Sequence, residues 1–172
     1  MDMPPESPLK GKVILAVDDE PDVLETLEEE LDMCIVHKAG DYDTAYQYLV
    51  SYTYDVVILD IMGVNGFELL RLSVLKGFPT VMLTAHSLSP ESLKTSIKLG
   101  AVSFLPKEKI HMIPFFLEDV VLERGKPAWK RLFDRLGDYF NKRFGPDWKE
   151  KDEFFRRFEE ELRQDQGVSG EG

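Results

Sequence analysis

Carboxylates stand directly after two apolar segments of this 172-residue sequence. Asp18 and Asp19 follow the run Lys12–Val17, and Asp60 follows the run Asp55–Leu59. Runs of β-branched and aliphatic residues are typical of strands that are buried on both faces. Because an unpaired buried charge is costly, we expect the three carboxylates at the open ends of these strands, beside a compensating cation.

Two further apolar segments also end in polar side chains. Thr84 and the small Ala85 follow the run Pro79–Leu83, and Lys107 follows the run Val102–Leu105 after one proline. The carboxyl ends of parallel strands meet at one edge of the sheet, where ligands bind. We therefore expect the hydroxyl and the ammonium group to face the three carboxylates.

This set of side chains suits phosphoryl chemistry that depends on Mg²⁺. Like charges at such range repel by roughly 4 kcal/mol per close pair at an effective dielectric constant of 20, which calls for a cation. All-oxygen ligands favour a hard divalent ion, and few protein ligands favour Mg²⁺. An ionised Asp60 can attack phosphorus, while Lys107 neutralises charge that develops on the phosphoryl oxygens. Thr84 can donate its hydroxyl to the bound group, and Ala85 leaves the approach open.

Each residue also has an ordinary structural explanation when it is taken alone. Asp18 or Asp19 can cap the helix that begins at Pro21. Thr84 alone fits a loop, and Lys107 alone fits a solvated charge. Their occurrence together at the ends of four strands favours a functional site.

The elements that position these residues alternate along the chain. The sequence predicts five strands, over Lys12–Val17, Cys34–His37, Asp55–Leu59, Pro79–Leu83 and Val102–Leu105. It predicts five helices between and after them, over Pro21–Asp32, 41–51, Gly66–Lys76, Pro90–Leu99 and Lys109–Glu123. This alternation predicts an α/β fold with a five-stranded parallel sheet and helices on both faces. The polar second strand suits a sheet edge, which fits the flavodoxin-like strand order 2-1-3-4-5.

Composition excludes several classes of protein. The net charge of −11 argues against a general nucleic-acid binder. Cys34 is the one cysteine, so an intramolecular disulfide is excluded. Neither a membrane-spanning run nor a signal peptide is evident, so we expect no membrane partner and a cytoplasmic location. We expect disordered tails over residues 1–9 and 166–172.

Four segments of the chain resemble the receiver domain of bacterial two-component response regulators. They are VILAVDDEPDVLETLEEEL, DVVILDIMGVNGFELL, TVMLTAH and GAVSFLPKEKI. The resemblance covers about residues 11–124, so we place a receiver domain over residues 10–125. Receiver domains share the strand order given above.

The resemblance implies a role for each residue at the strand ends. Asp60 is similar to the phosphoacceptor of the family. The expected Mg²⁺ ligands are Asp18, Asp19, Asp60 and the backbone carbonyl of Met62. The expected phosphate-binding and switch residues are Thr84, Ala85, Lys107 and Phe104. A sensor histidine kinase or a phosphotransfer protein would donate the phosphoryl group, and no enzymatic activity beyond slow loss of that group is implied. The face made by the fourth helix, fifth strand and fifth helix would then change its preference for partners.

The sequence departs from the family pattern at two places. The loop from Asp60 to Gly66 is about two residues short and lacks the usual Met-Pro element. Glu108 follows Lys107 where the family has a proline after a cis bond, so the bond here is either trans or held cis by its surroundings. His86, two residues after Thr84, either influences hydrolysis of the acyl phosphate or is an exposed loop residue.

The sequence predicts a helical hairpin over residues 126–165. The first helix starts near Pro127, carries an aromatic stripe and ends at Gly145 and Pro146. Residues 147–150 have the pattern of a capping box, which predicts the start of a second helix. Two helices bury too little surface to fold alone, so they must pack on the receiver or on a second chain. The hairpin would dimerise the protein, extend the fifth helix or dock a partner. Its 11 basic and 10 acidic residues do not favour DNA binding.

Two other functions fit parts of the sequence. One is a receiver that binds partners without phosphorylation, because of the short loop. The other is an aspartyl-phosphate phosphohydrolase of the haloacid dehalogenase type. That family has Asp-x-Asp after its first strand, whereas Asp18 and Asp19 are adjacent here, which disfavours it.

Overall fold

A five-stranded parallel sheet forms the centre of the molecule in the computed structural model, which describes residues 6–171 and side chains up to residue 164. The strands are β1 (Val13–Val17), β2 (Ile35–Ala39), β3 (Val56–Asp60), β4 (Thr80–Thr84) and β5 (Ser103–Pro106). Their order is β2-β1-β3-β4-β5, as the sequence predicted, with the polar β2 at one edge. The three central strands are buried almost throughout, which explains their near-continuous apolar sequences.

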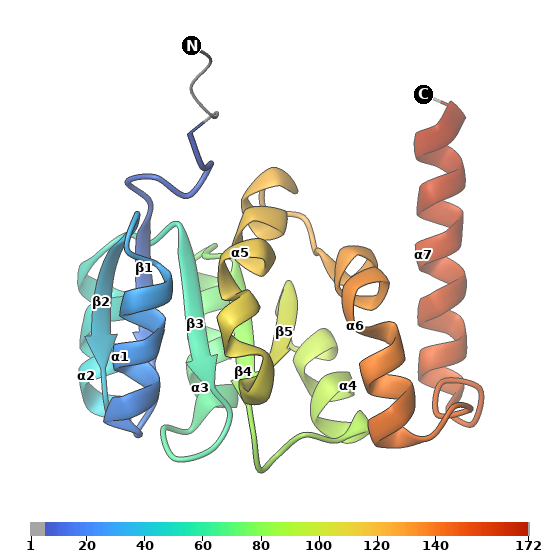
Figure 1. The fold of residues 1–172 in the computed structure, drawn as a ribbon, viewed down its shortest axis with the longest axis horizontal. Helices are drawn as coiled ribbons and strands as arrows, with labels where there is room; N and C mark the ends of the chain where they lie inside the picture. Colours follow the sequence, from blue (N-terminus) through green and yellow to red (C-terminus); the bar gives the residue numbers. More distant parts are fainter. Residues whose placement is uncertain (1–5, 172) are drawn as a thin grey trace.

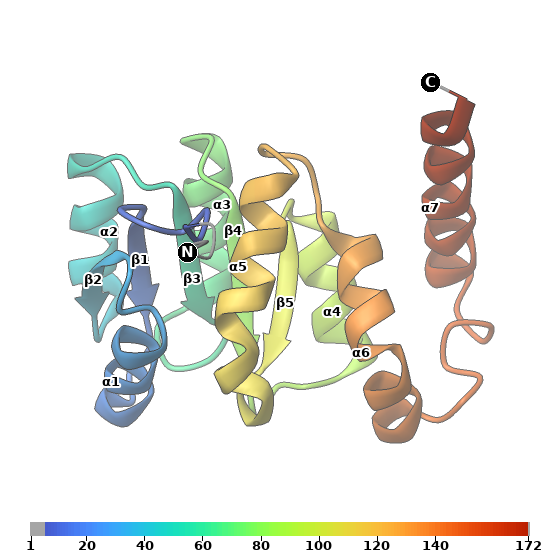
Figure 2. The same ribbon diagram turned by 45° about the horizontal axis from the view of Figure 1, so that its top comes forward.

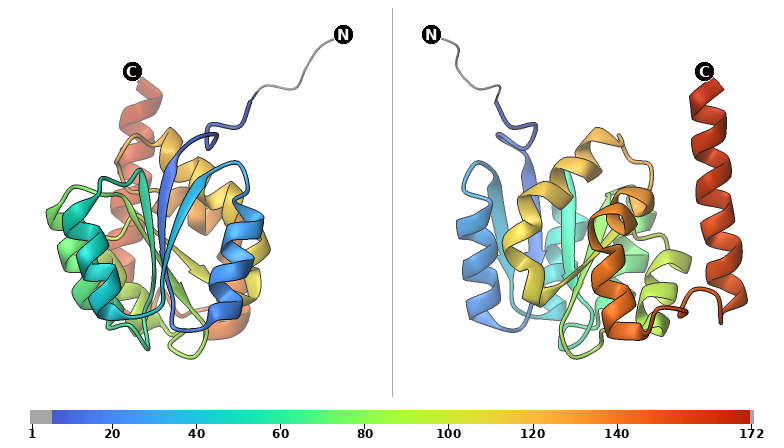
Figure 3. Two further views of the ribbon diagram at one scale, coloured as in Figure 1. Left: turned by 90° about the vertical axis from the view of Figure 1, so that its left-hand side faces the viewer. Right: turned by 45° about the vertical axis from the view of Figure 1, so that its right-hand side comes forward.

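Helices cover both faces of this sheet (Figures 1 and 2). On one face lie α1 (Pro21–Glu30) and α5 (Ile113–Leu122). On the other face lie α2 (Tyr42–Ser51), α3 (Gly66–Leu75) and α4 (Pro90–Lys98), as Figure 3 shows from the side. The Asp41 side chain caps α2, and a Ser89–Ser92 capping box starts α4.

The register of the strands brings their carboxyl ends to one edge. Val17 pairs with Leu59, so the next residue in each strand stands at the same level. Thr84 pairs with Pro106, immediately before Lys107. In Figure 1 this edge is at the bottom, and the described chain begins and ends near the top. All the predicted site residues at strand ends therefore share one edge, opposite the two chain ends.

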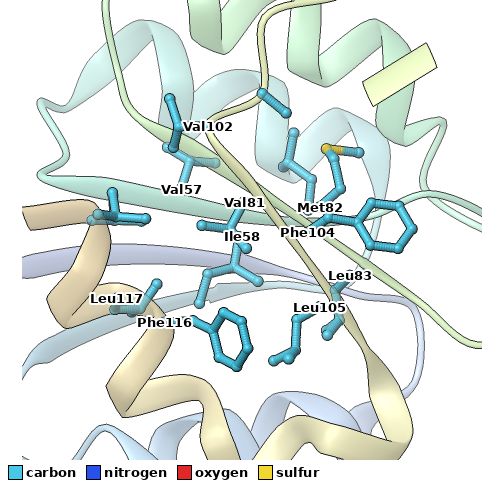
Figure 4. Packing of buried hydrophobic residues seen from close by; sticks show 14 of the residues in the cluster. Val57, Ile58, Val81, Met82, Leu83, Val102, Phe104, Leu105, Phe116 and Leu117 are labelled. Carbon is cyan, nitrogen blue, oxygen red and sulfur yellow. The ribbon is translucent and has the colours of Figure 1, made fainter. Parts of the chain in front are cut away.

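Side chains from both faces of the sheet fill the core (Figure 4). Leu105 of β5 faces α5, where it lies near Phe116. Phe104 points to the opposite side of β5 and has no exposed surface. Phe104 is thus a core residue on the face of β5 that points away from α5.

Most predicted elements begin or end one or two residues away from their observed bounds, and Asp60 and Thr84 are the last residues of their strands. The strand expected over Cys34–His37 runs instead over Ile35–Ala39. The helix expected from Lys109 begins as the 3₁₀ helix η1 (Lys107–Met112), and α5 starts only at Ile113. Pro114 lies in the first turn of α5, where its missing N–H is tolerated, which explains the late start.

The C-terminal segment lies beyond β5 and closes that edge of the sheet (Figure 2). Its first helix, α6 (Trp129–Phe144), buries Trp129, Leu132, Leu136 and Phe140. The Ala128 N–H donates to the Val102 carbonyl at 2.8 Å, so the linker to α6 bonds to the edge strand. The predicted aromatic stripe therefore packs on the chain's own sheet.

The start of the second C-terminal helix corrects the prediction. Residues 147–151 form turns, and α7 (Glu153–Glu171) starts later. Asp152 is the residue that caps it, because its Oδ1 accepts from the Phe154 N–H at 2.8 Å. Trp148 is buried against Phe155, with ring centroids 4.8 Å apart. Burial of Trp148 holds this stretch as a turn, which explains why the Asp147–Glu150 capping box does not form.

The expected tails also differ from the structure. Residues 1–5 lie outside the described part of the chain, but Leu9 has no exposed surface. Ser7 Oγ donates to Glu118 Oε1 at 3.1 Å, so the tail expected over 1–9 is anchored at its end. The backbone of α7 continues to Glu171 through the segment expected as a tail. None of the helices in the described residues is both long and apolar enough to cross a bilayer.

Candidate functional site

Asp18 lies buried beneath the carboxyl edge of the sheet. Its side chain has no exposed surface, and its Oδ1 accepts from the Glu20 N–H at 2.9 Å. Lys107 Nζ lies 2.9 Å from its Oδ2. The ion pair joins the end of β1 to the residue that follows β5, as the sequence predicted for these two groups.

Lys107 faces three carboxylates rather than one. Its Nζ lies 3.4 Å from Asp60 Oδ1 and 3.5 Å from Glu20 Oε1, in addition to the Asp18 contact. The Lys107 side chain is only 12% exposed, so these attractions are screened less than surface pairs. Glu20 was not among the predicted site residues, although it directly follows the acidic pair. Its place next to Asp19 could have indicated a fourth acid near the site.

Burial and crowding of negative charge change the acidities in the site. Burial, with the Asp18 charge second, raises the pKa of Asp60 to about 6 against the pull of Lys107. Burial also raises the pKa of Asp18, despite the attraction of the Lys107 ammonium. Burial opposes the charge on Lys107, but Asp18, Asp60 and Glu20 outweigh it and raise the pKa of that ammonium. Lys107 alone therefore does not compensate the carboxylates fully.

The carboxylates fit a cation of the expected kind. Asp18 Oδ2 is buried, and Lys107 Nζ, at 2.9 Å, pairs with it by charge without the geometry of a hydrogen bond, so lone pairs of this oxygen can still bind a cation. Oxygen atoms of Asp18, Asp19 and Glu20 lie within 4.8 Å of one another. These hard oxygen donors are the type that Mg²⁺ prefers. The predicted ligand set had Asp60 and the Met62 carbonyl in place of Glu20.

Two glycines allow the short loop after Asp60. Gly63 has φ of +85°, and a Cβ there would lie 2.4 Å from Asp19 Oδ2. A Cβ on Gly66 would lie 2.0 Å from the Asp60 carbonyl oxygen. Asn65 between them adopts the left-handed conformation with φ of 56°. The loop therefore folds tightly over Asp19, and only glycine fits at both contact points.

A small cavity of about 120 Å³ opens onto this group of residues. Its lining consists of Asp19, Glu20, Asp60, Met62, Gly63, Thr84, Ala85, His86, Ser87 and Lys107. Thr84 is buried, whereas Ala85 and His86 are exposed at the mouth. The predicted residues thus come together, except that Asp18 lies beneath the cavity and Phe104 lies outside it. A cavity of this size suits a phosphoryl group rather than a large ligand.

Glu108 takes part in contacts that the sequence did not predict. The described residues contain no cis peptide bond, so the Lys107–Glu108 bond is trans. The Tyr139 hydroxyl donates to Glu108 Oε1, and Arg143 Nη1 lies 3.3 Å from the same oxygen. Both partners belong to α6. The residue next to the site lysine is therefore joined to the C-terminal segment.

The fold and this arrangement of acids and lysine define the receiver class of α/β proteins. A family model for the response regulator receiver domain matches residues 14–112. The chain belongs to this family of two-component signalling proteins, whose domains are signalling modules rather than enzymes in general.

Individual relatives agree with this assignment. The two-component response regulator ARR18 of Arabidopsis thaliana is 37% identical over 103 residues, and the response regulator GtcR of Aneurinibacillus migulanus is 32% identical over 102 residues. Each alignment covers 56% of this chain, but only 16% and 42% of those relatives. A CheY-like receiver structure from Methanospirillum hungatei JF-1 has a TM-score of 0.57 at 23% identity, covering 71% of this chain and 99% of that one. This last likeness concerns the fold alone.

Proposed function

We propose that this protein is a response regulator whose Asp60 accepts a phosphoryl group in a reaction that depends on Mg²⁺. The observation that carries the proposal is the position of Lys107, which lies 2.9 Å from Asp18 and 3.4 Å from Asp60 at the mouth of a small cavity. A cation on one side and an ammonium on the other can together neutralise a phosphoryl group between them.

The chemistry follows from the groups that face the cavity. An oxygen of the Asp60 carboxylate attacks the phosphorus of a phosphohistidine on a sensor histidine kinase or a phosphotransfer protein. An O–P bond forms, and the N–P bond breaks with its electron pair left on the imidazole. Lys107 holds its proton and stabilises charge on the phosphoryl oxygens. Bound Mg²⁺, held by Asp18, Asp19, Asp60 and the Met62 carbonyl, would supply further charge neutralisation and lower the pKa of Asp60.

The switch would use Thr84 and Phe104. Thr84 is buried beside the cavity, where its hydroxyl can donate to an added phosphoryl oxygen. Phe104 lies one strand further along, in contact with the C-terminal segment rather than with the cavity. New contacts to the phosphoryl group would shift the population between two packed states of this region. We assign residues 10–125 to the receiver and residues 126–165 to a C-terminal extension that takes part in partner binding.

Phosphorylation by a small donor tests the proposal directly. The full chain is incubated with acetyl phosphate and Mg²⁺, and its intact mass is measured. We expect one acid-labile phosphoryl group on the natural chain and none on Asp60→Asn or in the presence of EDTA. An unmodified natural chain, or equal modification of the Asn variant, would reject Asp60 as phosphoacceptor.

One observation favours a second candidate, an interaction module that works without phosphorylation. The short loop holds Gly63 against the Asp19 carboxylate, where the proposed metal must bind. In that case the same experiment leaves the mass unchanged, while a partner binds the natural chain and Asp60→Asn equally well. Loss of partner binding in Asp60→Asn would exclude this candidate.

A further inference from the structure

Glu108 stands where the family pattern has proline, and its carboxylate points to the C-terminal segment instead of to the cavity. It directly follows Lys107 in the 3₁₀ helix η1. The Tyr139 hydroxyl donates to Glu108 Oε1, and Arg143 pairs with the same oxygen at 3.3 Å. Glu108 is therefore the point at which α6 reaches the chain next to the site.

Tyr139 is itself held firmly on α6. Its ring packs edge-on against the buried Phe140, with centroids 5.8 Å apart. Lys109 Nζ lies 5.3 Å above the Tyr139 ring, and Arg143 lies 5.9 Å from it. Two consecutive residues after Lys107 thus contact one aromatic side chain of α6. The Lys109 backbone departs from helical geometry, so the helix η1 alone does not fix this stretch firmly.

A second contact joins α6 to the strand that leads to Lys107. The ring of Phe104 in β5 packs edge-on against Phe140, with centroids 6.4 Å apart. Both rings are fully buried. Helix α6 therefore holds the chain on both sides of Lys107, through Phe104 before it and Glu108 after it.

We propose that Tyr139 and Arg143 are positioning residues of the phosphoacceptor site, which act on Lys107 through Glu108. The inference rests on the proposed function, because Lys107 serves the phosphoryl group in that reaction. Helix α6 then completes the site rather than only covering the sheet. Loss of its hold on Glu108 lets the Lys107 backbone move and weakens the contact of the ammonium with the phosphoryl oxygens.

The test separates the phosphoryl subsite from the metal subsite. Beryllofluoride, a mimic of the phosphoryl group, is titrated into the full chain at saturating Mg²⁺, and Mg²⁺ alone is titrated separately, both by calorimetry. Tyr139→Phe removes one hydroxyl and keeps the ring, and Arg143→Gln removes the ion pair. Arg131→Gln is the matched control, because Arg131 lies on the same helix and pairs at 2.6 Å with Glu123, away from Glu108.

We expect Tyr139→Phe combined with Arg143→Gln to weaken beryllofluoride binding by about two- to tenfold, the range of one or two exposed polar contacts. Acetyl phosphate should modify this double variant more slowly by a similar factor. Its affinity for Mg²⁺ alone should not fall, because Lys107 opposes the metal instead of binding it. Arg131→Gln should match the natural chain in both titrations. Glu108→Gln combined with Tyr139→Phe should lose less than the sum of the two single losses.

Each other outcome has a definite meaning. Beryllofluoride binding that is unchanged in the double variant overturns the inference but leaves the proposed function in place. Equal losses of beryllofluoride and Mg²⁺ affinity indicate general damage and also overturn it. If the double variant fails to fold, Tyr139→Phe alone decides between these outcomes. A natural chain that binds no beryllofluoride rejects the proposed function, and the inference falls with it.

Discussion

The Asp60 carboxyl is more stable in its neutral form than an exposed aspartate is, because its side chain is almost fully buried beside Asp18. Its folded pKa of about 6 exceeds the ordinary value of 3.8. The protonated form therefore contributes stability that is complete below about pH 4 and is lost as the pH rises through about 6. The proposed phosphoryl transfer requires the ionised form, so the burial that makes Asp60 fit this site also lowers stability at neutral pH.

This difference in pKa predicts how Asp60→Asn changes stability. In EDTA, we expect the variant to exceed the natural chain in free energy of unfolding by about 2 kcal/mol at pH 8. The difference in free energy of unfolding should shrink as the pH falls from about 6 toward 4, where the folded natural chain carries a neutral Asp60. It should nearly vanish at about pH 4. Urea denaturation of both chains at about pH 8, 6 and 4 measures this difference in free energy of unfolding. A gap that is independent of pH would contradict the raised pKa of Asp60.

Gly63 offers a second test at the residue scale. Gly63→Ala and the control Gly77→Ala both place alanine at φ near +85°, a strain of about 1–2 kcal/mol in each case. Only the Gly63 methyl group meets Asp19, whereas nothing lies within 4 Å of the Gly77 position. We expect Gly63→Ala alone to weaken Mg²⁺ binding, by about tenfold or more, in calorimetric titration. Equal Mg²⁺ affinities in the two variants would show that the loop does not constrain Asp19.

Sequence reasoning found the residues at the strand ends but not the contacts around them. Asp18, Asp60 and Lys107 could be placed because strand order and register bring strand ends together. Glu20 and Glu108 could not, because their partners depend on side-chain directions and on the position of α6. The closeness of Gly63 to Asp19 was equally hidden, since it depends on the path of one short loop.

Helices α5 and α6 are joined by a partly buried charge pair. Arg135 donates two hydrogen bonds to Asp119, at 2.6 and 3.0 Å, and the Asp119 side chain is only 6% exposed. The Arg135 guanidinium also lies 5.7 Å from the Phe115 ring. Such a paired geometry contributes far more than an exposed ion pair does.

Removal of Arg135 should therefore cost more stability than removal of an arginine from an exposed ion pair. We expect Arg135→Ala to lower the free energy of unfolding by about 2 kcal/mol, because Asp119 loses both hydrogen bonds and keeps only the longer contact with Arg131 at 3.7 Å. Arg157→Ala on α7 is the control, since Arg157 pairs with Glu153 at the surface. Its effect should stay within about 0.5 kcal/mol. Similar losses in urea denaturation of both variants would argue against a special role of the Arg135–Asp119 pair.

At the scale of elements, the regular alternation of strands and helices predicted each element of the sheet unit. The predicted start of a helix was wrong where a single residue determines it. Pro114 delays α5, and burial of Trp148 delays α7 until Asp152 can cap it. A capping pattern in the sequence specifies a helix start only when tertiary packing leaves the chain free to form it.

The C-terminal extension is part of the fold of the whole molecule. Its side chains cover Phe104, and its linker bonds to Val102 at the sheet edge. Lys94 of α4 pairs with Asp152 at 2.5 Å, so the extension is fixed to α4 as well as to α5. The sequence left open whether the extension packs on the receiver or on a second chain, because an aromatic stripe indicates a buried face but not the surface that covers it.

Truncation after Gly125 tests this role. We expect the truncated chain to unfold at lower urea concentration than the full chain and to self-associate, because it exposes the apolar face beside β5. Light scattering and urea denaturation measure the two effects. A truncated chain that is monomeric and as stable as the full one would show that the extension is not needed by the sheet. A full chain that is dimeric, with a monomeric and stable truncation, would instead assign dimerisation to the extension.

Both ends of the described chain lie toward the side of the molecule opposite the acidic cavity, with the end of α7 well away from the sheet (Figure 1). A fluorescent label or a surface tether attached at the first or the last described residue would therefore start on the side away from Asp60. A phosphodonor protein could still approach the cavity without obstruction. If Asp60 is the phosphoacceptor, forms labelled at either of these ends should be modified by acetyl phosphate at the same rate as the free chain, which suits the molecule to binding measurements on a surface.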